Sequence, residues 1–141
     1  MPISKEEMIA HLNKDLEWEY QALIQYIQHA SMIVGAAYGD IQKELVLHAT
    51  EEHAHAVSLA DQITNLGGVP TVEVEPRLTS PEVVTMLEQD LDGEKYAVQR
   101  YKERIRQAEE MQEYGLRRAL EDILIMEEEH VRDLLAALGE T

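Results

Sequence analysis

The sequence predicts an all-α fold, a four-helix bundle with one long crossover between the second and third helices. Three observations support this prediction. The chain has no Phe and only seven Gly and four Pro among 141 residues, and it is rich in the strong helix formers Glu, Leu and Ala. Its apolar residues recur at steps of three and four. Its second half repeats the first at an offset of 75 residues. We expect one domain, residues 1–141.

The first helix is predicted to begin near Ser4, because Glu7 follows at the spacing of a capping box. Residues 35–39 begin and end with glycine and are predicted to break the chain before the second helix. That helix is predicted to stop at Gly67 and Gly68. Each helix carries one inward-facing row. The two rows contain Leu12, Leu16, Glu19, Leu23, Tyr26 and Ala30, and then Ile41, Leu45, His48, Glu52, His55, Leu59, Ile63 and Leu66.

Residues 69–79 form the predicted crossover, because two prolines interrupt them and an extended segment of this length can span about 35 Å. The third helix is predicted to start with Ser80 as its N-cap and Pro81 in its first turn. The polar residues 107–114 contain the next turn. The rows of the last two helices contain Val84, Leu87, Leu91, Glu94, Val98, Tyr101 and Ile105, and then Leu116, Leu120, Ile123, Glu127, His130, Leu134 and Ala137.

Each half of the chain contains a glutamate followed 33 positions later by Glu-x-x-His. The six residues are Glu19, Glu52 and His55, and their repeats Glu94, Glu127 and His130. All six fall on the inward-facing rows, where carboxylates are costly unless a cation neutralises them. One Glu-x-x-His motif alone is weak evidence, since it could lie at a solvated boundary or in a structural polar layer.

The positions of the turns strengthen the metal interpretation. In an antiparallel hairpin, residues equidistant from the turn lie side by side. Glu19 and His55 are centred on position 37, inside the first predicted break. Glu94 and His130 are centred on position 112, inside the last turn. Each lone glutamate is therefore expected to meet the Glu-x-x-His motif of its partner helix.

Four carboxylates and two imidazoles suit two divalent ions, because four negative charges balance four positive ones. This ligand set favours Fe(II) or Mn(II), and Zn(II) can compete. One Glu from each of two helices, with Glu-x-x-His from the other two, is the arrangement known from di-iron carboxylate bundles. The ligand set therefore predicts a site for two divalent metal ions in each subunit.

Overall composition limits the other functions. The chain has 12 basic and 28 acidic residues, a net charge of −16, which disfavours binding to nucleic acid or to anionic membranes and attracts cations. Simple solubility is the alternative reason for such a charge. There is no cysteine, no leader-like start and no apolar stretch long enough to span a membrane. We expect a soluble cytoplasmic protein.

The chain resembles the bacterioferritin family in all four predicted helices. The residues that carry this resemblance are Leu12, Asn13, Lys14, Glu19, Ala22, Gln25, Tyr26, His29 and Ala30, then Glu52, His55 and Ala56, then Met86, Leu87, Asp90, Leu91 and Glu94, and finally Glu127, Glu128 and His130. The resemblance implies a ferritin-like fold and a ferroxidase centre that binds two Fe ions inside each subunit.

The resemblance also implies roles for single residues. Glu19 and Glu94 would be terminal ligands, Glu52 and Glu127 bridging ligands, and His55 and His130 would each bind one iron. Tyr26 matches the tyrosine beside the family's centre and would donate a hydrogen bond there. Tyr101 is its repeat, and core packing is the alternative role for both tyrosines.

Two departures from the family bear on assembly and haem. The chain ends soon after the fourth helix, whereas bacterioferritins carry a short fifth helix at the four-fold axis of a 24-subunit shell. We therefore expect a short form that assembles as a 12-mer rather than a 24-mer. The family's haem lies on a dimer two-fold axis and is held by a methionine next to the first helix-B ligand. His53 occupies that position here and is a candidate haem ligand, although it could simply be an exposed histidine.

Three more residues adjoin the predicted ligands. The family has an acid before each bridging glutamate, and here Glu51 keeps one whereas Met126 replaces the other. Metal-bound histidines donate their second N–H to an oxygen, so Glu51 is predicted to contact His130. His48 is expected to be a core histidine with its polar atoms paired.

The predicted function is ferroxidase activity with iron storage and detoxification, using O2 or H2O2 at an intra-subunit di-iron centre of a cage-forming homo-oligomer. The main alternative is a di-iron oxidase or peroxidase of the rubrerythrin kind that stores no iron. A metal-free interaction bundle is the third interpretation, and it would leave four buried carboxylates without partners.

Overall fold

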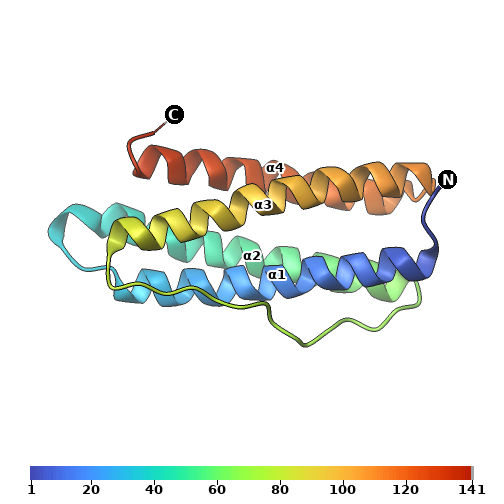
Figure 1. Ribbon diagram of the computed structural model, residues 1–141, viewed down its shortest axis with the longest axis horizontal. Helices are drawn as coiled ribbons and strands as arrows, with labels where there is room; N and C mark the ends of the chain where they lie inside the picture. Colours follow the sequence, from blue (N-terminus) through green and yellow to red (C-terminus); the bar gives the residue numbers. More distant parts are fainter. Residues whose placement is uncertain (141) are drawn as a thin grey trace.

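The computed structural model describes residues 1–140, and over that range the chain forms four long α-helices and no strand. The helices are α1 (Lys5–Met32), α2 (Gly39–Asn65), α3 (Val83–Glu110) and α4 (Tyr114–Ala137), with a short 3-10 helix η1 (Ala36–Tyr38) before α2. Figure 1 shows two antiparallel hairpins, α1 with α2 and α3 with α4, packed into one elongated bundle. The predicted all-α four-helix bundle is confirmed. No helix within these residues is long and apolar enough to cross a membrane.

The crossover from α2 to α3 runs along the bundle from one end to the other (Figure 1). It is fixed to α1 by hydrogen bonds rather than by a sheet. Asn13 donates from Nδ2 to the Val69 carbonyl at 3.0 Å and accepts the Thr71 N–H at Oδ1 at 2.8 Å. Further along, Gln25 Oε1 accepts the Leu78 N–H at 2.8 Å. These contacts satisfy backbone groups that an extended segment would otherwise leave unpaired.

Two of the three capping signals predicted at helix ends are present. Ser4 and Glu7 form a complete capping box at the start of α1. After α2, Gly67 has φ +87° and Gly68 donates back to Ile63 at 2.9 Å, which is the Schellman pattern.

The predicted start of α3 was wrong. The helix begins at Val83 with Glu82 as its N-cap, and Ser80 instead accepts the Glu82 N–H within the preceding turn at 3.0 Å. A serine before a proline can cap a local turn as readily as a helix, because both need the same side-chain acceptor.

The core consists of two apolar clusters at opposite ends of the bundle, and most residues of the predicted rows lie in them. One cluster contains Leu12, Leu16, Leu59, Ile63, Leu116 and Leu120, and the other contains Ala30, Leu45, Leu87, Leu91 and Leu134. Four row residues, Leu23, Ile41, Val98 and Ile105, are only partly buried. Val84, at the start of α3, and Ala137, at the end of α4, are exposed. Along every helix, the six predicted metal ligands fall between the two clusters. Apolar side chains therefore enclose the six predicted ligands from both ends of the bundle.

Candidate di-metal centre

The structure brings all six predicted ligands together at mid-length of the bundle. They are Glu19 from α1, Glu52 and His55 from α2, Glu94 from α3, and Glu127 and His130 from α4, and none is more than 8% exposed. Two groups of four can each surround one ion, with their ligand atoms within 4.8 Å of one another. Both groups contain Glu52 and Glu127. One group adds Glu19 and His55, and the other adds Glu94 and His130.

The distances fit metal coordination. His55 Nδ1 lies 3.2 Å from Glu127 Oε1 and 3.7 Å from Glu19 Oε2. His130 Nδ1 lies 3.0 Å from Glu52 Oε1 and 3.2 Å from Glu94 Oε1. Bonds of about 2.0–2.2 Å from a metal to nitrogen and oxygen would separate neighbouring ligand atoms by about 3 Å. Each imidazole thus faces its carboxylates at nearly the separation that a shared ion requires.

Several polar atoms at this centre have no hydrogen-bond partner although they are fully buried. They are one oxygen each of Glu19, Glu94 and Glu127, both carboxylate oxygens of Glu52, and Nδ1 of His55. Buried polar atoms without partners are rare and costly, and buried carboxylates are the most costly of all. Two cations would satisfy these atoms, so the residues present fit a pair of metal ions.

Crowding of the carboxylates shifts their pKa values in opposite directions. Burial, with the charges of Glu127 and Glu19, raises the pKa of Glu52 well above its usual range. Burial and Glu127 raise the pKa of Glu94 to about 8. Burial would also raise the pKa of Glu127, but contacts with His130 and His55 outweigh it and hold that pKa well below its usual value. Without metal, the centre therefore holds protons in place of cations.

The imidazoles hold protons as well. Burial alone would lower the pKa of His130, but contacts with Glu127 and Glu94 outweigh this effect and raise it to about 11. The pKa of His55 is raised too, because contacts with Glu127, Glu19 and Glu52 outweigh its burial. A metal ion must displace these protons before it can bind to either ring.

Two tyrosines connect the halves of the centre. Tyr26 on α1 donates its hydroxyl to Glu94 Oε1 at 2.7 Å, and Tyr101 on α3 donates to Glu19 Oε1 at 2.5 Å. The predicted hydrogen bond from Tyr26 is present, and its repeat mirrors it. Each tyrosine orients the lone glutamate of the opposite half, whose second carboxylate oxygen has no hydrogen-bond partner.

Glu51 makes the predicted contact, because its Oε1 lies 3.3 Å from His130 Nε2. With Nδ1 turned to the carboxylates, this contact fixes the orientation of the ring. Met126, where the family has the second acid, offers no oxygen to His55. The two halves of the centre therefore differ in how firmly their imidazoles are held.

Sequence reasoning missed a second polar layer beside the centre. Asp15 on α1 accepts from Arg104 Nε on α3 at 2.7 Å and from Arg100 Nε at 3.1 Å. Its repeat, Asp90, accepts from His29 Nδ1 and Gln25 Nε2, both at 2.9 Å. The 75-residue repeat places Gln25 on Arg100 and His29 on Arg104. The two acids were visible in the repeat, but their donors were not, because the residue types differ.

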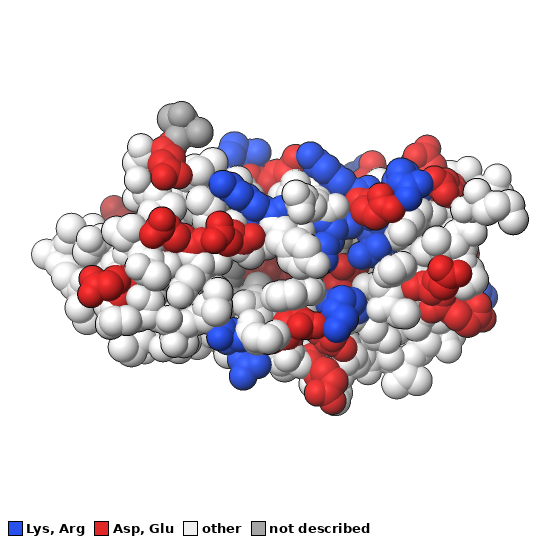
Figure 2. Space-filling view, in the orientation of Figure 1, with Lys and Arg blue, Asp and Glu red and all other residues white. Residues whose placement is uncertain are grey.

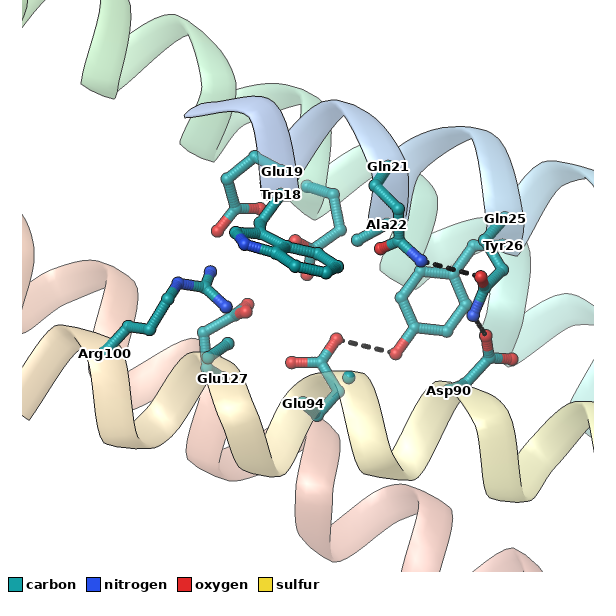
Figure 3. A pocket seen from close by; sticks show the side chains of 13 residues that line it. Trp18, Glu19, Gln21, Ala22, Gln25, Tyr26, Asp90, Glu94, Arg100 and Glu127 are labelled. Atoms are coloured by element: carbon teal, nitrogen blue, oxygen red, sulfur yellow. Dashed lines mark hydrogen bonds between the residues drawn. The ribbon is translucent and has the colours of Figure 1, made fainter. Parts of the chain in front are cut away.

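A small cavity of about 20 Å³ borders the centre between α1 and α3, which is room for about one water molecule. Figure 3 shows the carboxylates of Glu19, Glu94 and Glu127 turned toward a common space, with Trp18 and Arg100 at its rim. Arg100 lies over the Trp18 ring, 5.6 Å from its centroid. Water-sized molecules could approach the centre at this point.

His48 and His53, both on α2, are outside the set of six ligands. His48 is buried as predicted, but only Nε2 has partners, and Nδ1 has none. Burial and the neighbouring His130 lower the pKa of His48 to about 4. His53 is exposed on α2 and does not reach the centre.

Comparisons with known proteins identify the family of this chain. The ferritin-like domain of the ferritin family matches residues 9–141. A bacterioferritin of Brucella melitensis is 30% identical over 95% of this chain and 88% of its own length. A second bacterioferritin, from Desulfovibrio desulfuricans, is 28% identical over 90% of this chain and 72% of its own.

Two solved structures share the fold at a level well beyond chance. A ferritin-like diiron-carboxylate protein from Bacillus anthracis has a TM-score of 0.93 and 31% identity, covering 98% of this chain and 99% of its own. A dodecameric thioferritin, the bacterioferritin-related protein of Bacteroides fragilis, has a TM-score of 0.90 and 31% identity, covering 98% and 88%. Fold, ligand geometry and sequence similarity agree, and the chain belongs to the bacterioferritin family of ferritin-like di-iron proteins.

Proposed function

We propose that this protein is a ferroxidase that oxidises Fe(II) to Fe(III) and stores the product. The observation that carries this proposal is the sharing of Glu52 and Glu127 by two ligand groups. Shared carboxylates would hold two substrate ions side by side. Glu19 and His55 would complete the shell of one ion, and Glu94 and His130 that of the other. Four carboxylates would balance the charge of two Fe(II) ions.

Two adjacent Fe(II) ions can supply two electrons together, which suits O2 or H2O2 as the oxidant. Each Fe(II) gives up one electron, so the pair reduces one O2, with two protons, to H2O2. When H2O2 is the oxidant, the same two electrons and two protons yield two waters. Because both electrons leave together, no one-electron oxygen product has to be released. The apolar clusters on both sides of the centre limit access by bulk water.

Storage requires a closed assembly, and we propose a homo-oligomeric cage of 12 subunits rather than 24. The similar protein from Bacteroides fragilis is described as dodecameric, which supports the smaller number. His53, exposed on α2, is the residue whose replacement would test for haem at a dimer two-fold axis.

The test is stepwise addition of Fe(II) to the purified metal-free protein in air, following ferric absorbance and the iron that stays soluble with the protein. We expect rapid oxidation of the first two ions per chain and then continued uptake far beyond two. Glu127→Gln should abolish the rapid phase, whereas Glu129→Gln, an exposed change two residues away, should not.

Oxidation that stops near two ions per chain, with later iron precipitating, would instead indicate a di-iron oxidase or peroxidase and would contradict storage. No rapid phase in the unaltered protein would contradict the ferroxidase itself.

A further inference from the structure

A third group of metal-ligating side chains lies outside the di-metal centre. It consists of Glu44, His48 and Asp133, whose ligand atoms all lie within 4.8 Å of one another. Glu44 and His48 precede Glu52 at four-residue steps on α2, and Asp133 follows His130 by three residues on α4. These steps keep one helix face. The group therefore continues the ligand rows toward the end of the bundle where η1 lies.

The atoms of this group have the spacing of a coordination shell. His48 Nε2 lies 3.2 Å from Asp133 Oδ2 and 3.4 Å from Glu44 Oε1. Metal bonds of about 2.0–2.1 Å at tetrahedral angles would separate ligand atoms by about 3.3 Å. Nε2 is thus aimed at both carboxylates, at separations that one ion could bridge with little rearrangement.

The two carboxylates of the group are accessible to solvent, whereas the six ligands of the di-metal centre are buried. Glu44 and Asp133 line a surface pocket of about 480 Å³, and Asp40 adds a third carboxylate to its wall. No Lys or Arg from the described residues lines this pocket. The His48 side chain is only 1% exposed, whereas the side chains of Glu44 and Asp133 are 37% and 34% exposed. A cation entering the pocket would find a fixed nitrogen behind two movable carboxylates, with room for water ligands.

No lysine or arginine within residues 1–140 forms an ion pair with either carboxylate. Within this range, His48 is the only basic side chain beside them. They also oppose each other, and the close approach of Asp133, followed by burial, raises the pKa of Glu44. A divalent ion between them would remove this repulsion.

We propose that Glu44, His48 and Asp133 form a third metal site, which binds one divalent ion of the Zn(II), Co(II) or Fe(II) class with water completing its shell. One imidazole and two carboxylates form a borderline donor set that suits these ions. The site is mononuclear and open to water. Its imidazole stacks on His130 with ring centroids 3.9 Å apart, so the third site is in direct contact with a ligand of the di-metal centre. Metal binding at the third site does not depend on whether the di-metal centre oxidises iron.

The test is equilibrium dialysis of the assembled metal-free protein against Co(II) without oxygen, with metal analysis and visible absorption spectra. Unaltered protein should bind three ions per chain. Asp133→Asn and Glu44→Gln should each weaken one of the three by roughly tenfold or more, because even outer contacts change affinity by that factor. Asp122→Asn makes the same change at an exposed position of α4 and should leave all three ions bound.

The outcomes separate this proposal from the function proposed above. Two ions in the unaltered protein, or three ions of unchanged affinity in both variants, would overturn the third site. A single ion that is lost in Asp133→Asn would support the third site and contradict the di-metal centre. His48→Gln supplies a further check, since it should remove the third ion's nitrogen ligand and alter the visible spectrum of bound Co(II).

Discussion

Glu51 is the single residue outside the six ligands with the clearest role in positioning one of them. Its carboxylate holds His130 through Nε2, while Nδ1 of the same ring faces Glu52 and Glu94. The corresponding position on the other half is Met126, so His55 has no such carboxylate. The centre therefore contains one imidazole whose orientation is fixed by an acid and one whose orientation is not.

Replacing Glu51 should weaken one of the two ions. Loss of such an outer contact lowers metal affinity about 10–100-fold, so we expect Glu51→Ala to reduce affinity at the His130 side by that factor. Glu129→Ala, at an exposed position of α4, is the matched control. Calorimetric titration with Co(II) under argon measures both affinities. Equal affinities for Glu51→Ala and the unaltered protein would show that the contact has no role in holding metal.

Metal binding should release protons, because the metal-free centre holds them. The pKa values of Glu94, about 8, and His130, about 11, keep these two groups largely protonated at neutral pH, and the pKa values of Glu52 and His55 are raised as well. Metal needs the deprotonated forms, so apparent affinity should rise with pH as Glu94 loses its proton near pH 8. A pH-stat titration with Co(II) measures the release, with at most one proton from each of the four groups. Affinity independent of pH between about 6 and 8 would contradict this assignment.

At the residue scale, the sequence predicted the ligands better than their surroundings. The six ligands could be found because spacing along a helix and distance from a turn both follow from chain geometry. Arg100 and Arg104 could not, because nothing in a basic residue on a charged helix shows that it turns inward. Their burial depends on Asp15, a partner on another helix that local pattern does not reveal.

At the level of elements, α1 and α3 are joined by buried polar contacts rather than by apolar packing alone. Asp15 is fully buried and accepts three hydrogen bonds from Arg100 and Arg104, at 3.1, 2.7 and 3.2 Å. The repeat-related contacts of Asp90 lie on the other side of the centre. Both pairs therefore set the distance between the helices that carry Glu19 and Glu94.

Removing Asp15 should destabilise the bundle strongly. It would leave two buried guanidinium groups without an acid, and breaking a buried pair in this way costs about 3–5 kcal/mol. We expect Asp15→Ala to lower the free energy of unfolding of the metal-free protein by that amount. Asp122→Ala breaks the exposed pair with Arg118 and should cost less than about 0.5 kcal/mol. Urea unfolding followed by Trp18 fluorescence compares them, and similar losses would contradict the structural role of Asp15.

Helix boundaries were predictable where the signal residues have one structural use. The capping box at Ser4 and Glu7 and the glycine pair after α2 were both correct. Ser80 and Pro81 suit a turn as well as a helix start, and here the turn before α3 uses the Ser80 acceptor. The position of the crossover along α1 was also beyond sequence reasoning, because it depends on Asn13 and Gln25 contacting distant backbone.

On the scale of the whole molecule, the 75-residue repeat becomes an approximate two-fold arrangement about the metal centre. Tyr26 and Tyr101 donate across it to Glu94 and Glu19. Figure 2 shows acidic side chains from one end of this face to the other, whereas basic ones lie mostly over its middle. The net charge of −16 favours attraction of cations to the molecule as a whole. The number of subunits could be predicted only from the resemblance to bacterioferritins, because assembly depends on surfaces rather than on the core.

The most direct measurement is anomalous diffraction at the iron edge from crystals of the metal-free protein soaked in Fe(II) without oxygen. We predict two iron peaks at the centre of each chain, about 3.5–4 Å apart, with Glu52 and Glu127 between them. Glu19 with His55 should bind one ion, and Glu94 with His130 the other. A single peak at the centre, or none while Glu52 and Glu127 remain free, would contradict the di-metal assignment on which this account rests.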